Sequence, residues 1–152
     1  MKDRLLAAIR SELRARFDRL TKAAREAHAA ATDPGSKAES KYDTRSLEAS
    51  YLAAGQAKQV EDLARDIEIF ESATLPEIGI EDAIDAGALV EVDLNDEPQW
   101  FLLAPAAGGV TLDHEGREIT LLTPASALYQ KLLGLHTGDS LDDPPLFVSE
   151  VL

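Results

Sequence analysis

The sequence predicts an α+β protein in which an antiparallel coiled-coil helical hairpin precedes a small antiparallel sheet domain with one helix. Two stripes of apolar residues with helical spacing flank a break at Pro34-Gly35. After Pro76 the apolar residues begin to alternate instead, as they do in half-buried strands. The balance of charged residues changes at the same place. Residues 75–152 carry only 2 of the 15 basic side chains of the chain but 15 of its 28 acidic ones. We therefore expect a hairpin over residues 1–74 and a sheet domain over residues 75–152.

The first helix is predicted over residues 2–31. Apolar residues recur along it at every third or fourth position, at Leu6, Ile9, Leu13, Phe17, Leu20, Ala24 and Ala27. This spacing places them along one narrow face of a helix. Neither Gly nor Pro interrupts the segment before Thr32-Asp33-Pro34-Gly35, which is a strong helix stop and turn signal.

The second helix is predicted from residue 43 or 44 to residue 72. Its stripe consists of Leu47, Tyr51, Ala53 or Ala54, Val60, Leu63, Ile67 and Phe70. Neither stripe can be buried alone, so the two helices should fold back on each other and leave a polar tip at about residues 33–42. Leu5, Leu52 and Ile69 lie off this seam without forming a second continuous stripe, which favours a monomer.

Five short strands are expected in the sheet domain. Val90, Val92 and Leu94 alternate with polar residues and precede a turn at residues 95–98. An apolar strand at residues 100–104 follows, and then a hairpin about the turn at residues 113–116 and a final strand at residues 146–151. Local turns between successive strands predict a meander that closes into a partly open barrel.

One helix of about ten residues is predicted between the fourth and fifth strands. Thr123 is the expected N-cap, Pro124 the first helical residue and Gly134 the C-terminal stop. Leu128, Leu132 and Leu133 are expected in the core, and Gly138-Asp139 should form a turn.

Composition excludes several classes of function. The chain of 152 residues has no Cys, and His28, His114 and His136 show no metal-ligand spacing, so we expect neither a metal site nor thiol chemistry. No histidine has a visible catalytic partner, and we expect no cofactor and no enzymatic activity of the chain itself. No apolar run approaches the ~20 residues of a membrane span, and the start of the chain lacks the apolar core of a signal peptide, so we expect a cytoplasmic protein. The acidic second half disfavours independent binding of duplex DNA.

The segment from Ile119 to Asp139 resembles the C-terminal motif of bacterial Gre transcription elongation factors, the GreA/GreB-like family. Thr123-Pro124 stands where the family has Ser-Pro, Leu132-Leu133-Gly134 matches the end of the helix, and Gly138-Asp139 matches the following turn. Residues 87–90 are similar to the first strand of that domain, and residues 42–51 to the start of the second hairpin helix. The resemblance covers nearly the whole chain and implies an FKBP-like fold for the C-terminal domain.

The resemblance implies a regulator that docks its globular domain at the rim of RNA polymerase and inserts the hairpin into the secondary channel. Pro124 and Ser126 would contact the polymerase from the exposed start of the helix, and Tyr42 from the tip. In the cleavage factors of the family, acidic tip residues help to hold a catalytic Mg²⁺ so that the polymerase cuts backtracked RNA. The candidates here are Asp33, Glu39 and Asp43, as carboxylates are suitable Mg²⁺ ligands.

The tip departs from the family pattern, because Lys41 stands where an acidic residue is usual and the acidic pair has no unique alignment. Asp33 and Asp43 could instead cap helix ends, with Glu39 solvated. Two interpretations therefore stay open. The protein is a Gre-like regulator, with or without stimulation of transcript cleavage, or it is a coiled-coil interaction or oligomerisation module for another partner.

Overall fold

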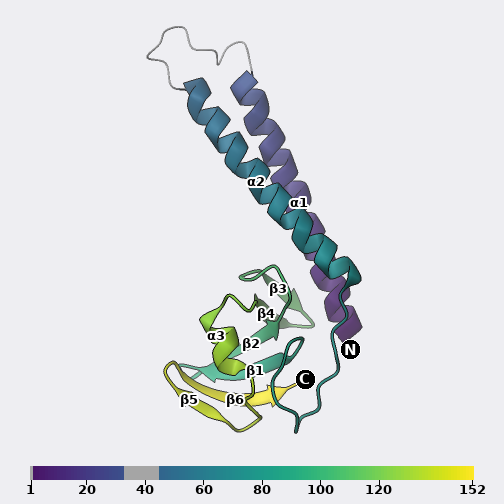
Figure 1. Cartoon of the computed structure of the whole chain (residues 1–152), viewed down its shortest axis with the longest axis vertical. Coiled ribbons are helices and arrows are strands. Elements are labelled where there is room, and N and C mark those ends of the chain that lie inside the picture. The colour runs from purple at the N-terminus through teal and green to yellow at the C-terminus, as the bar shows by residue number, and fades with distance from the viewer. Residues whose placement is uncertain (1, 33–44) are drawn as a thin grey trace. The chain divides into compact units, whose positions relative to one another are not determined.

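The computed structural model describes residues 2–32 and 45–152 of the chain (Figure 1). Two helices come first, α1 (Lys2–Thr32) and α2 (Arg45–Ser72). A sheet domain follows, with β1 (Leu89–Leu94), β2 (Glu97–Leu103), β3 (Thr111–His114), β4 (Arg117–Leu122), α3 (Ala127–Leu132), β5 (Ser140–Asp142) and β6 (Pro145–Val151). The α+β class, with two long helices before a sheet domain, is confirmed.

The chain forms two compact units, one of residues 1–10 with 69–152 and the other of residues 11–68. The predicted domain boundary between residues 74 and 75 lies inside the first of these. The first residues of α1 and the last residues of α2 therefore belong to the same compact unit as the sheet.

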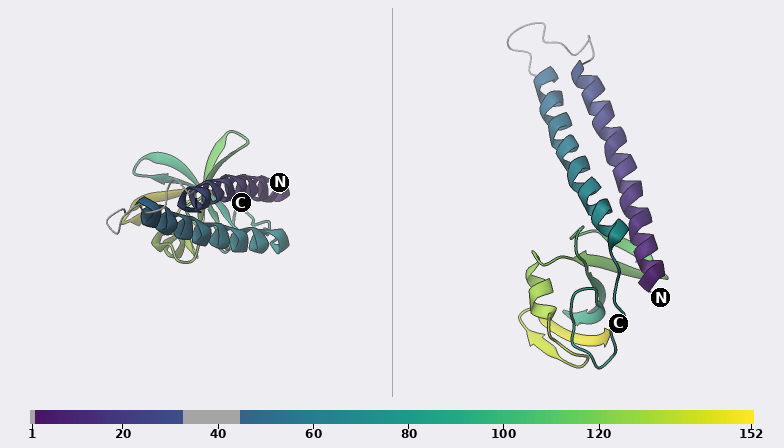
Figure 2. Two further views of the ribbon diagram at one scale, coloured as in Figure 1. Left: turned by 90° about the horizontal axis from the view of Figure 1, so that it is seen from above. Right: turned by 45° about the vertical axis from the view of Figure 1, so that its right-hand side comes forward.

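In the unit of residues 11–68, α1 and α2 run antiparallel, side by side (Figure 2). Leu13 is fully buried between them and Leu63 is 8% exposed. Further along the predicted seam, Phe17, Leu20, Ala24 and Val60 are only half-buried. The predicted tip, residues 33–42, lies outside the described residues.

The sheet has six strands in the order β3-β4-β2-β1-β6-β5. Neighbouring strands are antiparallel except β2 and β4, which pair in parallel with Trp100 opposite Ile119 and Leu102 opposite Leu121. The expected antiparallel meander of five strands is therefore wrong in two respects. The sheet is mixed, because the β3-β4 hairpin crosses over and adds its second strand to β2. A short strand, β5, also precedes the final one.

Tight two-residue turns close two of the hairpins. Asn95 and Asp96 have φ of 53° and 66° between β1 and β2, and Glu115 and Gly116 have φ of 53° and 77° between β3 and β4. Two successive positive φ values are typical of type I′ turns, whose twist matches that of the flanking strands. Glu97 and Pro98, expected in the first turn, belong instead to β2.

α3 covers one face of the sheet and completes the main core. Tyr129 and Leu132 of α3 pack in one cluster with Val90, Val92 and Val148 of the sheet. Ile84, on the segment before β1, belongs to the same cluster and is 1% exposed. Leu128 and Leu133 pack at the edge of this cluster, so their predicted place in the core is confirmed in part.

The first turns of α1 lie against the opposite face of the sheet domain. Leu5, predicted to lie off the helical seam, is 1% exposed, and with Lys2 it lines a small gap that Leu89 and His114 also border. Leu6 and Ile9 are buried on the neighbouring stripe of the same helix. This short stretch of α1 therefore buries two faces, one in the helical seam and one against the sheet.

Lys2 is buried although it is a lysine. Its side chain is 2% exposed, and its ammonium group donates hydrogen bonds to the carbonyls of Pro76 (2.5 Å) and Gly87 (2.9 Å). Gly87 has φ of 86°, and a Cβ there would lie 2.4 Å from the Pro76 ring, so only glycine fits. Lys2 thereby fixes the connector between α2 and β1.

Arg10 caps the C-terminal end of α2. Its Nε donates to the carbonyl of Phe70 (2.7 Å), and its Nη2 donates to those of Glu71 (3.2 Å) and Ala73 (3.3 Å). The last carbonyls of a helix have no partner within the helix, and a cation there also interacts favourably with the helix dipole. The last turn of α2 contains no basic residue of its own, so α1 supplies the charge.

We expect Arg10→Met to lower the free energy of unfolding by about 1–2 kcal/mol, because three backbone carbonyls lose a charged donor. Urea unfolding followed by circular dichroism measures this loss. Arg4→Met is the matched control, since the Arg4 side chain is 83% exposed and its one ion pair, with Glu115, spans 3.9 Å. Equal stability of the two variants would contradict the capping role.

Because of Lys2, the free energy of unfolding should depend on pH in the alkaline range. Burial lowers the pKa of Lys2 from 10.5, and the nearby Glu77 partly opposes this shift. The unfolded chain then holds the Lys2 proton more tightly than the folded chain. The free energy of unfolding, taken as wild type minus Lys2→Met, should therefore rise with pH from the lowered pKa up to 10.5. Unfolding curves of both proteins at several pH values test this, and a constant or falling difference would refute it.

Candidate partner-binding site

The four candidate residues of the tip, Asp33, Glu39, Tyr42 and Asp43, lie outside the described residues. Pro124 and Ser126 are described, and both lie in the segment that enters α3. Among residues 2–32 and 45–152, no group of three His, Cys, Asp or Glu side chains is arranged to hold a metal ion. In the same ranges, no helix is both long enough and apolar enough to cross a membrane.

Ser126, and not Thr123, is the N-cap of α3. Ser126 has extended φ and ψ of −79° and 132°, and its hydroxyl accepts a hydrogen bond from the Tyr129 amide at 3.5 Å. Thr123 lies one turn earlier, where its carbonyl accepts from the Ser126 amide at 2.8 Å. The helix is consequently shorter than the ten residues predicted. Serine and threonine are both good N-caps. Ser126 takes this position because residues 123–126 form a separate turn before the helix begins.

Pro124 and Ala125 are exposed on this turn, and Ala127 is exposed just after the cap. The Pro124 carbonyl accepts a hydrogen bond from Gln130 Nε2 at 2.9 Å, across the first turn of the helix. Thr123 is fixed by close packing, since a Cβ on Gly108 would lie 2.9 Å from its hydroxyl. The result is a small exposed surface of Pro and Ala on a well-anchored backbone.

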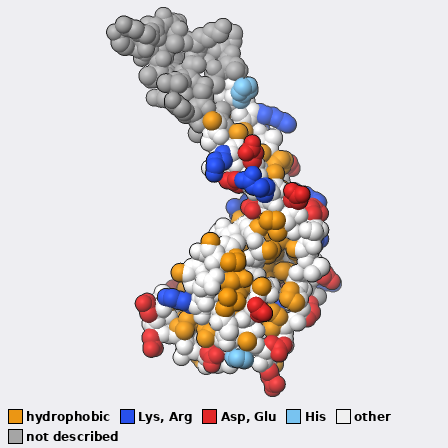
Figure 3. Space-filling view, viewed as in Figure 1, with side chains coloured by type: hydrophobic (Ala, Val, Ile, Leu, Met, Phe, Trp, Pro, Cys, Tyr) orange, Lys and Arg blue, Asp and Glu red, His pale blue; other side chains and the backbone are white. Residues whose placement is uncertain are grey.

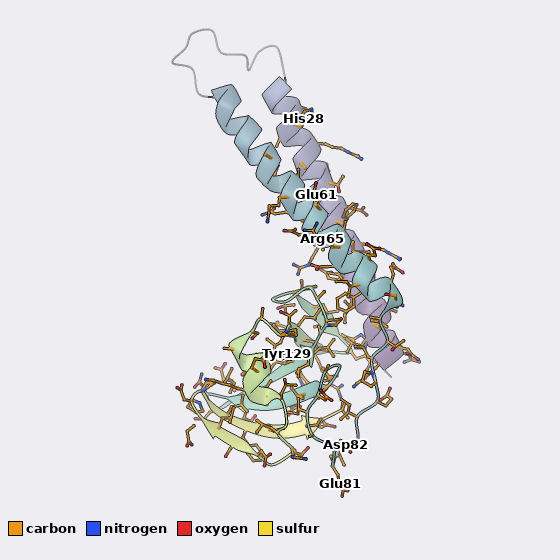
Figure 4. All side chains as sticks on the ribbon, in the orientation of Figure 1. His28, Glu61, Arg65, Glu81, Asp82 and Tyr129 are labelled. Carbon is orange, nitrogen blue, oxygen red and sulfur yellow. The ribbon has the colours of Figure 1, made fainter. Side chains whose placement is uncertain are left out.

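The far end of α3 is anchored to the rest of the domain by backbone hydrogen bonds. The Gly134 amide donates to the Ile84 carbonyl at 2.9 Å, and the Ile84 amide donates to the Leu135 carbonyl at 2.8 Å. Gly134 has φ of 84°, as expected for a residue that ends a helix. Tyr129 points from the middle of α3 towards the sheet (Figure 4). The start of the helix, at Pro124 and Ala125, stays exposed.

The turn at Gly138-Asp139 is also present. Gly138, with φ of 91°, donates to the Val148 carbonyl at 2.8 Å, and the Val148 amide donates to the Asp139 carbonyl at 2.8 Å. The Asp139 side chain accepts from the His136 amide at 2.7 Å. Asp139 thus has a structural role, because it closes its own turn.

A second surface feature is a groove of about 600 Å³ between the two long helices, within the unit of residues 11–68. His28 and Glu61 lie on its border, from α1 and α2 respectively (Figure 4). Its lining is mainly apolar and consists of Thr21, Ala24, Arg25, His28, Ala29, Ala57, Val60 and Glu61. The groove was not predicted from the sequence, although the run of alanines on the stripe indicates it.

The described residues define an α+β protein in which a long antiparallel helix pair precedes a mixed-sheet domain with one short, capped helix. The chain is similar to the solved structure of GreA factor homolog 1 (Gfh1) of Thermus thermophilus, with 24% identity over 94% of each chain and a TM-score of 0.37. It is also similar to a structure of the transcription factor Gfh1 (22% identity, 93% of this chain, 92% of that one, TM-score 0.37). Gfh1 of Thermus aquaticus has 18% identity over the same shares of the two chains, with a TM-score of 0.35.

The first of these proteins is, by its name, a homologue of GreA. No protein-family model matches the chain, and no curated protein matches it.

Ser126→Ala should lower the free energy of unfolding by about 0.5–1 kcal/mol, because the Tyr129 amide loses its cap. Ser126→Asp keeps a side-chain acceptor and should stay within about 0.5 kcal/mol of wild type. Urea unfolding measures both, and Ser140→Ala on the exposed β5 is the control for loss of a surface hydroxyl. A Ser126→Asp variant as unstable as Ser126→Ala would argue against the cap.

Proposed function

We propose that this chain is a Gre-like transcription elongation regulator that binds RNA polymerase. The single observation that supports this most is the conformation of the family-like segment 119–139. It forms a strand, a Thr-Pro turn in which Pro124 is exposed, a short helix that ends at a positive-φ Gly134, and a closed turn at Gly138-Asp139. Pro124 is exposed at the start of this helix, as the proposed contact with the polymerase requires.

In this proposal the sheet domain docks at the rim of the polymerase and the helix pair enters the secondary channel as a monomer. The helix pair supports such a role because α1 has 31 residues and α2 has 28, so at ~1.5 Å per residue each extends over roughly 40 Å or more. The polymerase supplies the catalytic centre, and the protein acts in the cytoplasm, where its partner is. Stimulation of RNA cleavage would then depend on Asp33, Glu39 and Asp43.

A second function has its own support in the groove between α1 and α2. Its apolar lining would accept large side chains from a third helix, as in helical assemblies. In that case the helix pair is an interaction or oligomerisation module with no role in transcript cleavage. Binding to polymerase, or its absence, separates the two functions.

The deciding experiment measures binding to the cognate RNA polymerase together with RNA cleavage by backtracked complexes in Mg²⁺. We expect Pro124→Ala to weaken binding severalfold while the free energy of unfolding changes by less than about 0.5 kcal/mol, as is usual for surface substitutions. Pro145→Ala, at an exposed proline where β6 begins, is the matched control and should bind as wild type does.

The tip is tested on the same samples with Asp33, Glu39 and Asp43 all changed to Ala. Cleavage that is faster with the wild-type protein and is lost in this variant would support delivery of carboxylates to the polymerase. Binding without faster cleavage would make the protein a regulator that only occupies the channel. Absence of binding by the wild-type protein would reject the proposal in favour of the interaction module.

A further inference from the structure

The exposed surface before α3 is the tip of a β-turn over residues 123–126. The Ser126 amide donates to the Thr123 carbonyl at 2.8 Å, which closes the turn, and Pro124 takes its second position. Type I and type II turns both accept proline there, and they differ in the orientation of the peptide between the second and third residues. In this turn that peptide joins Pro124 to Ala125. Its orientation decides which backbone groups the turn exposes.

Gln130 holds this peptide in one orientation. Its side-chain Nε2 donates to the Pro124 carbonyl at 2.9 Å, and its backbone amide donates to the Ser126 carbonyl at 3.3 Å. The Pro124 carbonyl precedes the N-cap of α3, so the bond from the Gln130 side chain is not one of the hydrogen bonds of the helix. Gln130 is exposed, and a single surface contact adds little to the stability of a domain. Its effect is therefore on the turn and not on the fold.

The same hydrogen bond decides where the amide of Ala125 points. A trans peptide is planar, and its carbonyl and N–H point in opposite directions. Because the Pro124 carbonyl points towards Gln130, the Ala125 N–H points away from it. Ala125 is exposed, and no residue in the described part of the chain accepts a hydrogen bond from its amide. The turn thus presents a backbone donor to a partner.

This donor lies in an uncharged part of an acidic domain. Residues 119–130 contain no Asp, Glu, Lys or Arg, although residues 75–152 carry 15 acidic and 2 basic side chains. Figure 3 shows hydrophobic side chains gathered on the face where α3 lies, with several acidic ones along the lower edge of the domain. A partner at Pro124 therefore meets small apolar side chains and backbone groups. The orientation of the Pro124–Ala125 peptide sets the polar part of that contact.

We propose that Gln130 is a positioning residue for the partner contact at Pro124, because it aims the Ala125 amide at an acceptor oxygen of the partner. The inference rests on the proposed function, in which this partner is RNA polymerase. A turn held in one orientation before binding loses less conformational entropy on binding than a turn that samples two. Removal of the Gln130 donor should consequently weaken binding while α3 stays folded.

The test compares three substitutions of Gln130 in the full chain, with affinity for the cognate RNA polymerase as the first readout. Gln130→Met and Gln130→Glu remove the donor at nearly constant length and should raise Kd about three- to tenfold, as for the loss of one hydrogen bond. Gln130→Lys restores a donor and should bind within about twofold of wild type. Thr137→Val is the matched control, since it removes an uncharged donor to another backbone carbonyl, that of Ile80 at 3.2 Å, and should leave Kd unchanged.

The second readout needs no partner. In the free protein, labelled with ¹³C and ¹⁵N, the resonances of the Pro124 carbonyl and the Ala125 amide should shift in Gln130→Met and return towards wild type in Gln130→Lys. The midpoint of urea unfolding should stay within about 0.3 M of wild type in all variants.

Resonances that do not change in Gln130→Met, or weaker binding that Gln130→Lys does not restore, would overturn the inference. Wild-type affinity of Gln130→Met beside weaker binding of Pro124→Ala would also overturn it, while the proposed function would stand. Failure of the wild-type protein to bind polymerase would reject the proposed function, and with it the role of Gln130 in this contact.

Discussion

The unit that contains the sheet depends on two cations of α1 that bind backbone carbonyls. Arg10 satisfies the carbonyls that α2 leaves open at its C-terminal end, and Lys2 fixes the connector at Pro76 and Gly87. Neither contact joins two charged side chains, so each cation is stabilised by dipoles that the fold itself orients. Burying Lys2 costs free energy, which the hydrogen bonds and the surrounding apolar contacts of Leu5 offset. Together they set where the helices end and where the sheet begins.

The basic side chains are divided unevenly along the chain. Lys2 and Arg10 of α1 bind the connector and cap α2, while the sheet domain, residues 75–152, contains only two basic residues. Of its two cations, one is stacked on Trp100 and the other holds a backbone carbonyl near the β5-β6 turn. Several of its carboxylates accept hydrogen bonds from backbone amides instead, as Asp82 does from Gly79 and Asp139 does from His136.

Sequence reasoning located the elements much better than their pairing. Both long helices, the turn at Gly116 and the final strand follow from periodicity and turn residues, which are local signals. The parallel pairing of β2 with β4 has no local signal, because the sequence of the β3-β4 hairpin does not show which strand of the sheet it pairs with.

The burial of Leu5 and Lys2 was not predicted for a related reason. A helical stripe identifies one buried face, and only the tertiary structure shows that the first turns of α1 bury a second. Pro124 was placed correctly as an exposed residue, whereas the cap moved from Thr123 to Ser126 because two good caps lie one turn apart. The tip residues lie outside the described part of the chain, so their roles stay predictions.

The strand β1 contributes to both faces of the sheet. Val90 and Val92 face the core beneath α3, whereas Leu89, one residue earlier, lines the small gap beside Lys2 and Leu5 of α1. Hydrogen bonds hold β1 on both sides, to β2 and to β6. The proposed contact at Pro124 lies on the side of α3, so a partner bound there leaves the contacts of α1 with the sheet in place.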